Sequence, residues 1–232
     1  MNIVITGASR GLGKAFANIF AKNGHSFFLC SRNEAVLKTT IEELKNTFPQ
    51  SNFSYIAIDI SIKDEAIRFA NWCLSFGTPD ILINNAGSFI PGSVYNEPDM
   101  ALEEMMASNL YSTYHVTRTV LPKMMERKSG HIFNMCSIAS IKEYPSGGSY
   151  SISKFALLGF SKNLREELKP FNIKVTSIIP GATYTDSWKN SGVDEKRLMQ
   201  ENDIAQMVYA ASQLSVQACV EEIIVRPQLG DL

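Results

Sequence analysis

The sequence predicts an α/β fold in which helices cover both faces of a parallel β-sheet. Short apolar runs rich in β-branched and aromatic residues alternate with longer amphipathic segments along the whole chain of 232 residues. Interior runs such as residues 81–83 are continuously apolar, which is typical of strands buried on both faces. No linker, repeat or low-complexity segment interrupts the alternation, so we expect one domain over residues 1–232.

The first strand leads into a glycine-rich turn. Residues 2–6 are mostly β-branched, the segment 7–13 contains Gly7, Gly11 and Gly13, and a helical pattern follows over residues 14–23. A strand, a glycine turn and a helix in this order can bind a nucleotide phosphate, because the backbone can approach closely and the helix start offers free N–H groups. The spacing differs from the common Gly-x-Gly-x-x-Gly, and a turn without a ligand is the alternative.

The second strand, residues 26–31, predicts which dinucleotide binds. An acidic residue at the end of this strand usually binds the ribose hydroxyls of NAD. Here the position holds Ser31, with Arg32 next to it and Arg10 in the glycine turn. Two guanidinium groups and no carboxylate favour a 2′-phosphate, so NADP(H) is the predicted cofactor. The alternative is that Arg32 lies in solvent without contacting a ligand.

The later segments continue the alternation. We expect strands at 53–58, 80–84, 131–136, 173–179 and 222–225, and helices at 34–48, 62–76, 98–127 and from about 149 to 170. Ser61 is the expected N-cap of the helix over 62–76.

Tyr150 and Lys154 lie on one face of the last long helix, because positions i and i+4 of a helix are neighbours. A free tyrosine has a pKa of about 10, and a nearby cation lowers that pKa enough for proton transfer near neutral pH. The alternative is an ordinary surface helix.

Composition excludes several function classes. The net charge is −1 and the basic residues are dispersed, which does not indicate a nucleic-acid partner. The four cysteines are far apart and no histidine has metal-ligand spacing, so no metal site is expected. We find no signal-peptide pattern before Ile3 and no apolar run near 18 residues, so a soluble cytoplasmic protein without membrane contact is expected.

Together these motifs resemble the short-chain dehydrogenase/reductase family over essentially the whole chain. The matching residues are Thr6 to Gly13, Asn84 to Gly87, Asn109, Ser137, Tyr150 to Lys154, and Pro180-Gly181 with Thr185, and Ser137 precedes Tyr150 by thirteen residues as in family members. The resemblance implies a Rossmann-type doubly wound sheet of seven strands in the order 3-2-1-4-5-6-7. It also implies reduction of a ketone or aldehyde by hydride transfer from NADPH.

The resemblance assigns a role to each matching residue. Tyr150 would be the general acid, Lys154 would lower its pKa and bind the nicotinamide ribose, and Ser137 would donate a hydrogen bond to the substrate oxygen. Asn109 would interrupt its helix and hold a proton-relaying water, unless it merely faces solvent. The implied cofactor contacts are Gly7, Ala8, Ser9, Arg10, Gly11, Leu12, Gly13, Arg32, Asp59, Ile60, Asn85, Ala86, Gly87, Tyr150, Lys154, Pro180, Gly181, Thr183 and Thr185.

The likeness is greatest to 3-oxoacyl-carrier-protein reductases and related carbonyl reductases, so a 3-oxoacyl thioester or similar small carbonyl compound is the expected substrate. Residues expected to line the pocket are Phe89, Ile138, Tyr144 and Trp188. The segment 185–203 is short for a lid in this family and predicts an open pocket.

Partner predictions also come from the resemblance. The positions that would dock an acyl-carrier protein hold Lys128 and Phe171, so one of two basic charges is missing and docking stays open. Relatives pair the helices corresponding to residues 101–127 and 149–169, which predicts a homodimer or homotetramer. A regulatory protein that binds NADP(H) without turnover is the alternative function.

Overall fold

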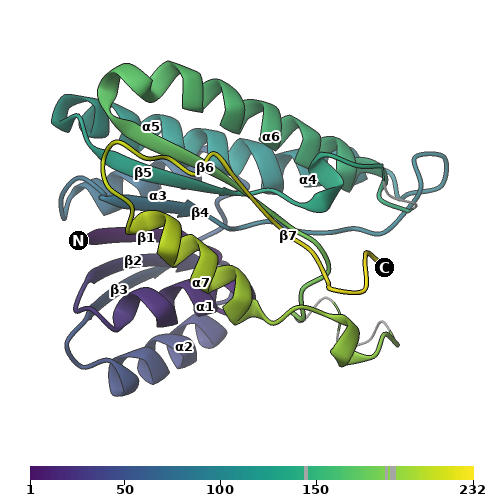
Figure 1. The fold of residues 1–232 in the computed structure, drawn as a ribbon, viewed down its shortest axis with the longest axis horizontal. Helices are drawn as coiled ribbons and strands as arrows, with labels where there is room; N and C mark the ends of the chain where they lie inside the picture. The colour runs from purple at the N-terminus through teal and green to yellow at the C-terminus, as the bar shows by residue number, and fades with distance from the viewer. Residues whose placement is uncertain (144–145, 186–187, 189–191) are drawn as a thin grey trace.

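The computed structural model describes residues 1–143, 146–185, 188 and 192–232. Its centre is a parallel sheet of seven strands in the order β3-β2-β1-β4-β5-β6-β7, which confirms the predicted order (Figure 1). The strands are β1 (Asn2–Thr6), β2 (Ser26–Ser31), β3 (Asn52–Ala57), β4 (Ile81–Asn84), β5 (Gly130–Met135), β6 (Ile173–Pro180) and β7 (Glu222–Val225).

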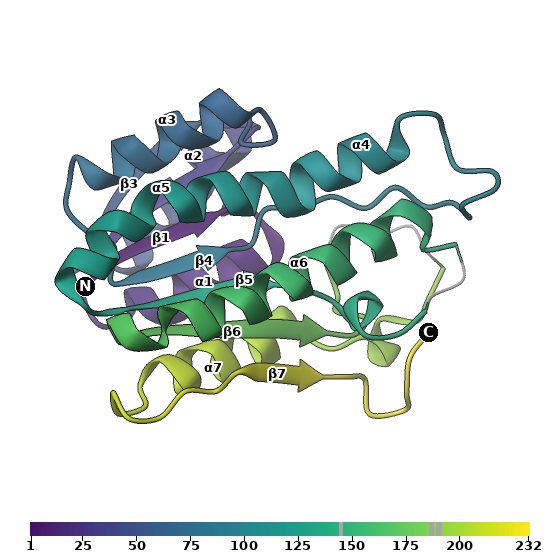
Figure 2. The ribbon, with the colours of Figure 1, turned by 90° about the horizontal axis from the view of Figure 1, so that it is seen from above.

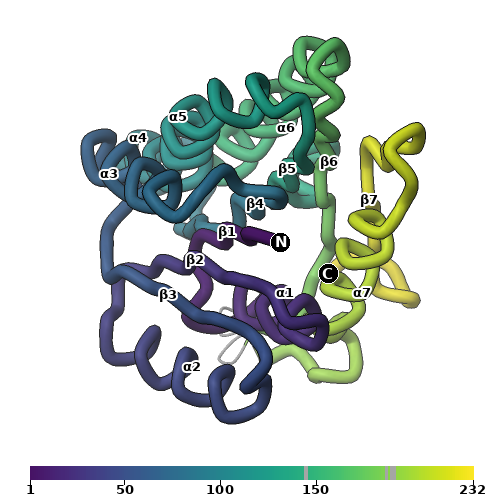
Figure 3. The backbone as a smooth tube through the Cα atoms, turned by 90° about the vertical axis from the view of Figure 1, so that its left-hand side faces the viewer, coloured from purple at the N-terminus to yellow at the C-terminus, as the bar shows by residue number. Residues whose placement is uncertain are grey.

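Helices cover both faces of the sheet, as predicted. One layer holds α1 (Gly11–Ala21), α2 (Glu34–Thr47) and α7 (Glu201–Ser212). The other holds α3 (Lys63–Leu74), α5 (Ser112–Arg127) and α6 (Gly148–Leu168), with α4 (Ala101–Met106) before α5 (Figures 1 and 3). The short helical segments are η1 (Ala107–Tyr111), η2 (Ile138–Ser140), η3 (Lys169–Phe171) and η5 (Glu195–Arg197).

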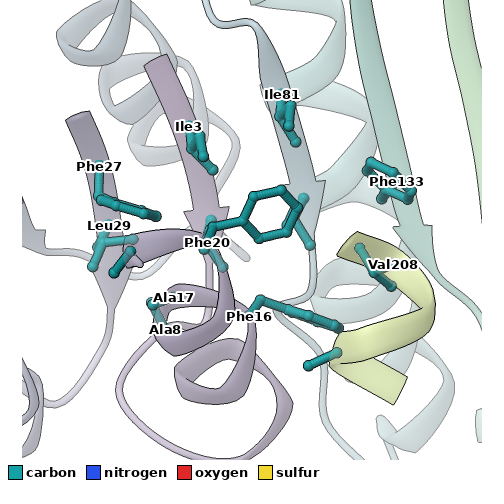
Figure 4. Packing of buried hydrophobic residues seen from close by; sticks show 14 of the residues in the cluster. Ile3, Ala8, Phe16, Ala17, Phe20, Phe27, Leu29, Ile81, Phe133 and Val208 are labelled. Atoms are coloured by element: carbon teal, nitrogen blue, oxygen red, sulfur yellow. The ribbon is translucent and has the colours of Figure 1, made fainter. Parts of the chain in front are cut away.

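Each helical layer buries its own hydrophobic cluster against the sheet. Below the sheet, Phe16 and Phe20 of α1 pack with Ile3, Phe27 and Val208, and all five side chains are 0% exposed (Figure 4). A second cluster lies between the opposite face and α3, α5 and α6. Strands with apolar residues on both faces can be buried in this way only in a sheet covered twice, which explains their unbroken apolar runs.

Two predicted details of the helices have different outcomes. Ser61 is not the N-cap of α3, since that helix begins at Lys63 with Ile62 in the capping position. Asp59 Oδ1 instead accepts hydrogen bonds from the backbone N and the hydroxyl of Ser61, so a local turn uses the serine. The interruption expected at Asn109 is present, because η1 is a π-helical segment between α4 and α5.

The topology places one crevice at the carboxyl ends of the strands. The chain runs outward from β1 to β3 on one side and then continues from β4 to β7 on the other. The connections after β1 and β4 therefore leave the sheet toward opposite faces, and ligands of doubly wound folds bind between such connections. Among the described residues, no helix has the length and apolar character needed to span a bilayer.

Candidate active site

The glycine turn after β1 brings the start of α1 close to the sheet. Gly7 has a φ of 65°, and a Cβ atom there would lie 2.9 Å from Ala86 Cα. A Cβ atom at Gly13 would lie 2.2 Å from the carbonyl oxygen of Gly7, so no side chain fits at that position. The two glycines therefore allow the close packing by which the N–H groups of a helix start can reach a phosphate.

Asn85 attaches the end of β4 to this turn. Its Nδ2 donates hydrogen bonds of 3.0 Å to the carbonyl oxygens of Thr6 and Gly7. Thr6 Oγ1 accepts bonds of 2.9 Å from the backbone N of Asn85 and of Ala86. The connections after β1 and β4, which border the crevice, are thus held at a set separation.

A cavity of about 310 Å³ lies beside this junction. Near its β2 side, the hydroxyls of Ser9 and Ser31 form a hydrogen bond of 2.8 Å. The predicted cofactor residues that line it are Gly7, Ser9, Arg10, Arg32, Asp59, Ile60, Asn85, Ala86 and Gly87. Both arginines thus border one cavity, although they are 22 positions apart in the sequence.

Some predicted contact residues do not border the described cavities. Ala8 is 0% exposed and belongs to the hydrophobic cluster under the sheet. Gly13 packs on Gly7, and Gly11 faces Thr185, whose Cγ2 would lie 3.8 Å from an added Cβ. Ala8 and Gly13 therefore shape the glycine turn through packing inside the protein.

A neighbouring cavity collects the remaining predicted residues. It shares Asn85 and Gly87 with the first cavity, so the two form one groove along the carboxyl edge of the sheet. Its other predicted residues are Leu12, Ser137, Tyr150, Lys154, Pro180, Gly181, Thr183 and Thr185.

Lys154 is a buried ammonium beside the Tyr150 ring. The side chain is buried, Nζ donates a hydrogen bond of 2.7 Å to the carbonyl oxygen of Met135, and Nζ lies 5.7 Å from the centroid of the Tyr150 ring. Burial lowers the pKa of Lys154 to about 8, because the charged form loses hydration. Phe89 packs edge-on against Tyr150 from the opposite connection, at 5.0 Å between centroids.

Ser137 lies at the end of β5 and begins η2. Its Oγ accepts a hydrogen bond of 3.2 Å from the backbone N of Ala139, while Ser140 Oγ accepts one of 3.1 Å from the backbone N of Ser137. Because Ser137 Oγ is an acceptor in this turn, its hydroxyl proton can be donated elsewhere. Ser137 and Tyr150 both line a third cavity, of about 430 Å³.

Asn109 lies behind the groove and does not line it. Its Oδ1 accepts from the backbone N of Ser88 at 2.9 Å, and its Nδ2 donates to Ser88 O at 3.1 Å and Ser153 Oγ at 2.9 Å. A Cβ atom at Gly87 would lie 2.7 Å from Asn109 Oδ1 and 3.6 Å from Lys154 Nζ. The buried amide therefore joins the connection after β4 to the helix that carries Lys154. Ser88 and Ser153 carry no sequence signal for this contact.

The third cavity is the candidate substrate pocket. Phe89, Ile138 and Trp188 line it as predicted, whereas Tyr144 lies outside the described residues. Sequence reasoning missed Lys142, Asp231 and Leu232, which also line it.

Asp231 and Leu232 therefore form one wall of the pocket, in addition to Trp188, and the expectation of an open pocket from segment 185–203 falls partly outside the described residues. Asp231 Oδ1 accepts a hydrogen bond of 3.0 Å from Arg226 Nε, and Asp231 Oδ2 lies 3.6 Å from Lys142 Nζ. This clasp joins segments 89 residues apart in the chain, counted from Lys142 to Asp231, and no local pattern predicts it.

The expected carrier-docking positions are far from this pocket within one chain. Lys128 and Phe171 lie two residues before the first residues of β5 and β6, at the amino edge of the sheet. Ser137 follows the carboxyl end of β5, at the opposite edge. Within one chain these two positions therefore lie at the opposite edge of the sheet from the pocket, and docking of an acyl-carrier protein stays open.

The comparison with known families agrees with this geometry. The family model described as short chain dehydrogenase matches residues 1–196. The chain belongs to the short-chain dehydrogenase family. This short-chain dehydrogenase is 30% identical over 227 residues to an uncharacterized oxidoreductase of Staphylococcus aureus strain MRSA252, covering 97% of this chain and 96% of the relative.

Solved structures of relatives have the same fold. A metagenomic short-chain oxidoreductase in complex with NADP superposes with a TM-score of 0.86 at 28% identity, covering 98% of this chain and 97% of the other. A 3-oxoacyl-[acyl-carrier protein] reductase from Brucella melitensis with bound NAD has a TM-score of 0.85 at 28% identity, covering 97% and 89%.

Proposed function

We propose that this short-chain dehydrogenase reduces a ketone or aldehyde to an alcohol with NADPH, using Tyr150 as general acid. The observation that carries the proposal is the convergence of Ser137, Tyr150 and Lys154 on one groove. That groove begins at a glycine turn with the geometry of a phosphate site and ends at an apolar pocket.

The residues present fit a dinucleotide phosphate. The crowding at Gly7 and Gly13 brings the start of α1 to the groove, where its N–H groups would hold the pyrophosphate. Arg10 and Arg32 would pair with a 2′-phosphate, and the small hydroxyl of Ser31 at the end of β2 does not repel it. Relatives are known with NADP and with NAD, so the two arginines are what favour NADPH here.

NADPH, when bound, supplies the hydride that adds to the carbonyl carbon. Tyr150 donates its phenolic proton to the carbonyl oxygen, which completes the alcohol. Ser137 donates a hydrogen bond to the same oxygen and stabilises the negative charge that develops there. Both hydroxyls line the pocket in which the substrate carbonyl would lie.

Lys154 makes the phenol acidic enough for this transfer. Its ammonium is held near Tyr150 by the bond to the Met135 carbonyl, and its pKa of about 8 keeps it mostly protonated at neutral pH. A cation at this distance stabilises the phenolate that remains after proton transfer. Asn109 would support the arrangement through Ser153, which lies next to Lys154.

The pocket lining supports a small carbonyl substrate with an apolar group. Phe89, Ile138 and Trp188 provide the apolar surface. A 3-oxoacyl thioester is one member of this class, in line with the name of the Brucella relative.

We also propose that the chain forms a homodimer or homotetramer. The side chains expected to provide the contact are partly used inside the monomer, since Met105 is buried and Phe160 packs on a core cluster. Exposed apolar side chains remain on η1 and α6, namely Tyr111, Ile152 and Phe155 at 49%, 45% and 49% exposure. Light scattering that gives only the 25.8 kDa mass of one chain at micromolar concentration would contradict this proposal.

Turnover measured by NADPH oxidation tests the proposed activity. The panel contains 3-oxoacyl thioesters, aldehydes, diketones and steroids, and Tyr150→Phe is the matched inactive control. Oxidation that depends on the carbonyl compound and is lost in the variant supports the proposal. Tight NADPH binding without turnover on any of these compounds would favour the regulatory alternative.

A further inference from the structure

The connection between β4 and α4 contacts the first turn of α6 at two points. Figure 2 shows this connection running past the carboxyl ends of the strands toward the start of α6. Phe89 packs on the Tyr150 ring, as described above. Farther along, the Glu97 carboxylate accepts two hydrogen bonds from Ser149, one of 2.9 Å from the backbone N and one of 2.6 Å from the hydroxyl.

The start of α6 has no cap from its own sequence. Gly147 is at the N-cap position and has no side chain, so the first N–H groups of the helix need an acceptor from elsewhere. Ser149 is only 1% exposed, which excludes water as a full substitute. Glu97 provides the acceptor, and its negative charge lies at the positive end of the helix dipole.

The surrounding backbone is built tightly around this carboxylate. Gly148 has a φ of 26°, and a Cβ atom there would lie 2.4 Å from Glu97 Oε2 and 2.6 Å from the carbonyl oxygen of Gly92. Gly92 N donates to the carbonyl oxygen of Ser146 at 3.1 Å, and Glu97 N donates to Ser93 O at 2.8 Å. The connection is therefore folded on itself and attached to the start of the helix beside the carboxylate.

The hydrogen bonds from Ser149 lower the pKa of Glu97, with the hydroxyl bond as the largest cause. The side chain is consequently ionised at neutral pH. Ser149 directly precedes Tyr150, so the backbone that Glu97 holds is the backbone from which the phenol projects.

We propose that Glu97 is a positioning residue that fixes the first turn of α6 and so aims the Tyr150 phenol at the carbonyl oxygen bound by Ser137. This inference rests on the proposed function, because it takes Tyr150 as the proton donor. A loop anchor without such a role would stabilise the protein and leave the chemical step unchanged.

The test compares Glu97→Ala with Glu97→Gln, which keeps one acceptor oxygen in place. The matched control is Glu167→Ala, which removes an exposed carboxylate near the other end of the same helix. Hydrogen exchange of a peptide covering residues 147–154 is measured for each variant, together with kcat, KM and the dissociation constant of NADPH.

Glu97→Ala should speed exchange of the first-turn amides about tenfold, as loss of a cap does. It should lower kcat about tenfold to a hundredfold with little change in NADPH affinity, because small displacements of a catalytic group cost rate more than binding. Glu97→Gln should recover most of kcat, and Glu167→Ala should match the wild type in every measurement.

If the first-turn amides of Glu97→Ala exchange at the wild-type rate, Glu97 does not cap α6. If they exchange faster while kcat is unchanged, Glu97 does not position Tyr150. If Glu97→Gln does not recover kcat, the proposed role of the side-chain oxygen as acceptor is also contradicted. A wild-type enzyme without turnover on any carbonyl compound would refute the proposed function, whereas the exchange comparison would still decide whether Glu97 holds the helix.

Discussion

Lys154 Nζ donates a hydrogen bond of 2.7 Å to the carbonyl oxygen of Met135, the last residue of β5. This bond joins the helix that carries Tyr150 to the strand end that leads, two residues later, to Ser137. The two groups proposed to bind the substrate oxygen are therefore tied together through the lysine. The lysine places a positive charge beside the Tyr150 ring and also connects α6 to β5. Substitutions can separate these two effects.

Tyr150→Phe removes the phenolic proton and keeps the ring that packs on Phe89. We expect folding and NADPH binding to survive while kcat falls about 10²-fold to 10⁴-fold, the usual contribution of general acid catalysis. Steady-state kinetics on a substrate found by the NADPH screen provide the measurement. Retention of more than about half of the wild-type rate would show that Tyr150 is not the acid.

Lys154→Met removes the ammonium and should lower kcat as well as NADPH affinity, since the resemblance to the family implies contacts with both the phenol and the ribose. The residual activity should shift to higher pH, because the pKa of Tyr150 returns toward about 10 without the cation. Kinetics as a function of pH, with Ser137→Ala as comparison, test this. Ser137→Ala should slow turnover without a change in NADPH affinity or a shift of the profile.

Lys154→Met should lower activity but raise the stability of the folded protein at neutral pH. The pKa of Lys154 is about 8 in the folded protein and about 10.4 in an unfolded chain. Between these two pKa values the unfolded state binds more protons than the folded state, so the free energy of unfolding rises with pH. The buried lysine therefore destabilises the folded protein most below pH 8, and this cost disappears as the pH rises toward 10.4. Lys154→Met should therefore melt at a higher temperature than wild type at pH 7, with a smaller difference near pH 10. A lower melting temperature at pH 7 would mean that the bond to Met135 outweighs the cost of burial.

NADPH should be preferred over NADH by about tenfold or more in kcat/KM, which corresponds to about 1.4 kcal/mol. The reason is that Arg10 and Arg32 border the same cavity, next to the Ser9–Ser31 hydroxyl pair. Arg32→Asp should narrow or reverse the ratio, and Lys38→Ala, an exposed change on α2, should leave it intact. Equal efficiencies with the two cofactors would refute the proposed contact with the 2′-phosphate.

Asp231→Asn should loosen the clasp with Arg226 and Lys142 that closes one wall of the pocket. We expect kcat/KM for bulky carbonyl compounds to rise relative to small ones, by no more than about fivefold, because partly exposed ion pairs contribute at most about 1 kcal/mol. Glu222→Gln, which breaks the exposed pair with Lys162, is the matched control. An unchanged ratio would show that the chain end does not limit substrate size.

The sequence by itself determined the layered fold, because strand and helix periodicity and the glycine turn are local properties of the chain. It also placed Tyr150 and Lys154 on one helix face, since positions four apart on a helix are neighbours, and it related them to Ser137 through a known family pattern. The N-cap rule failed at Ser61, because its hydroxyl donates to Asp59 in a local turn and does not cap α3.

Only the tertiary structure decided the contacts between distant segments. Asn109 with Ser153, Glu97 with Ser149 and Asp231 with Lys142 pair residues that are 44, 52 and 89 positions apart, and none belongs to a repeating pattern. Such contacts depend on where the folded sheet brings its connections together. The sequence thus determines which reactive side chains are present, and the packing of loops against α6 determines how those side chains are oriented.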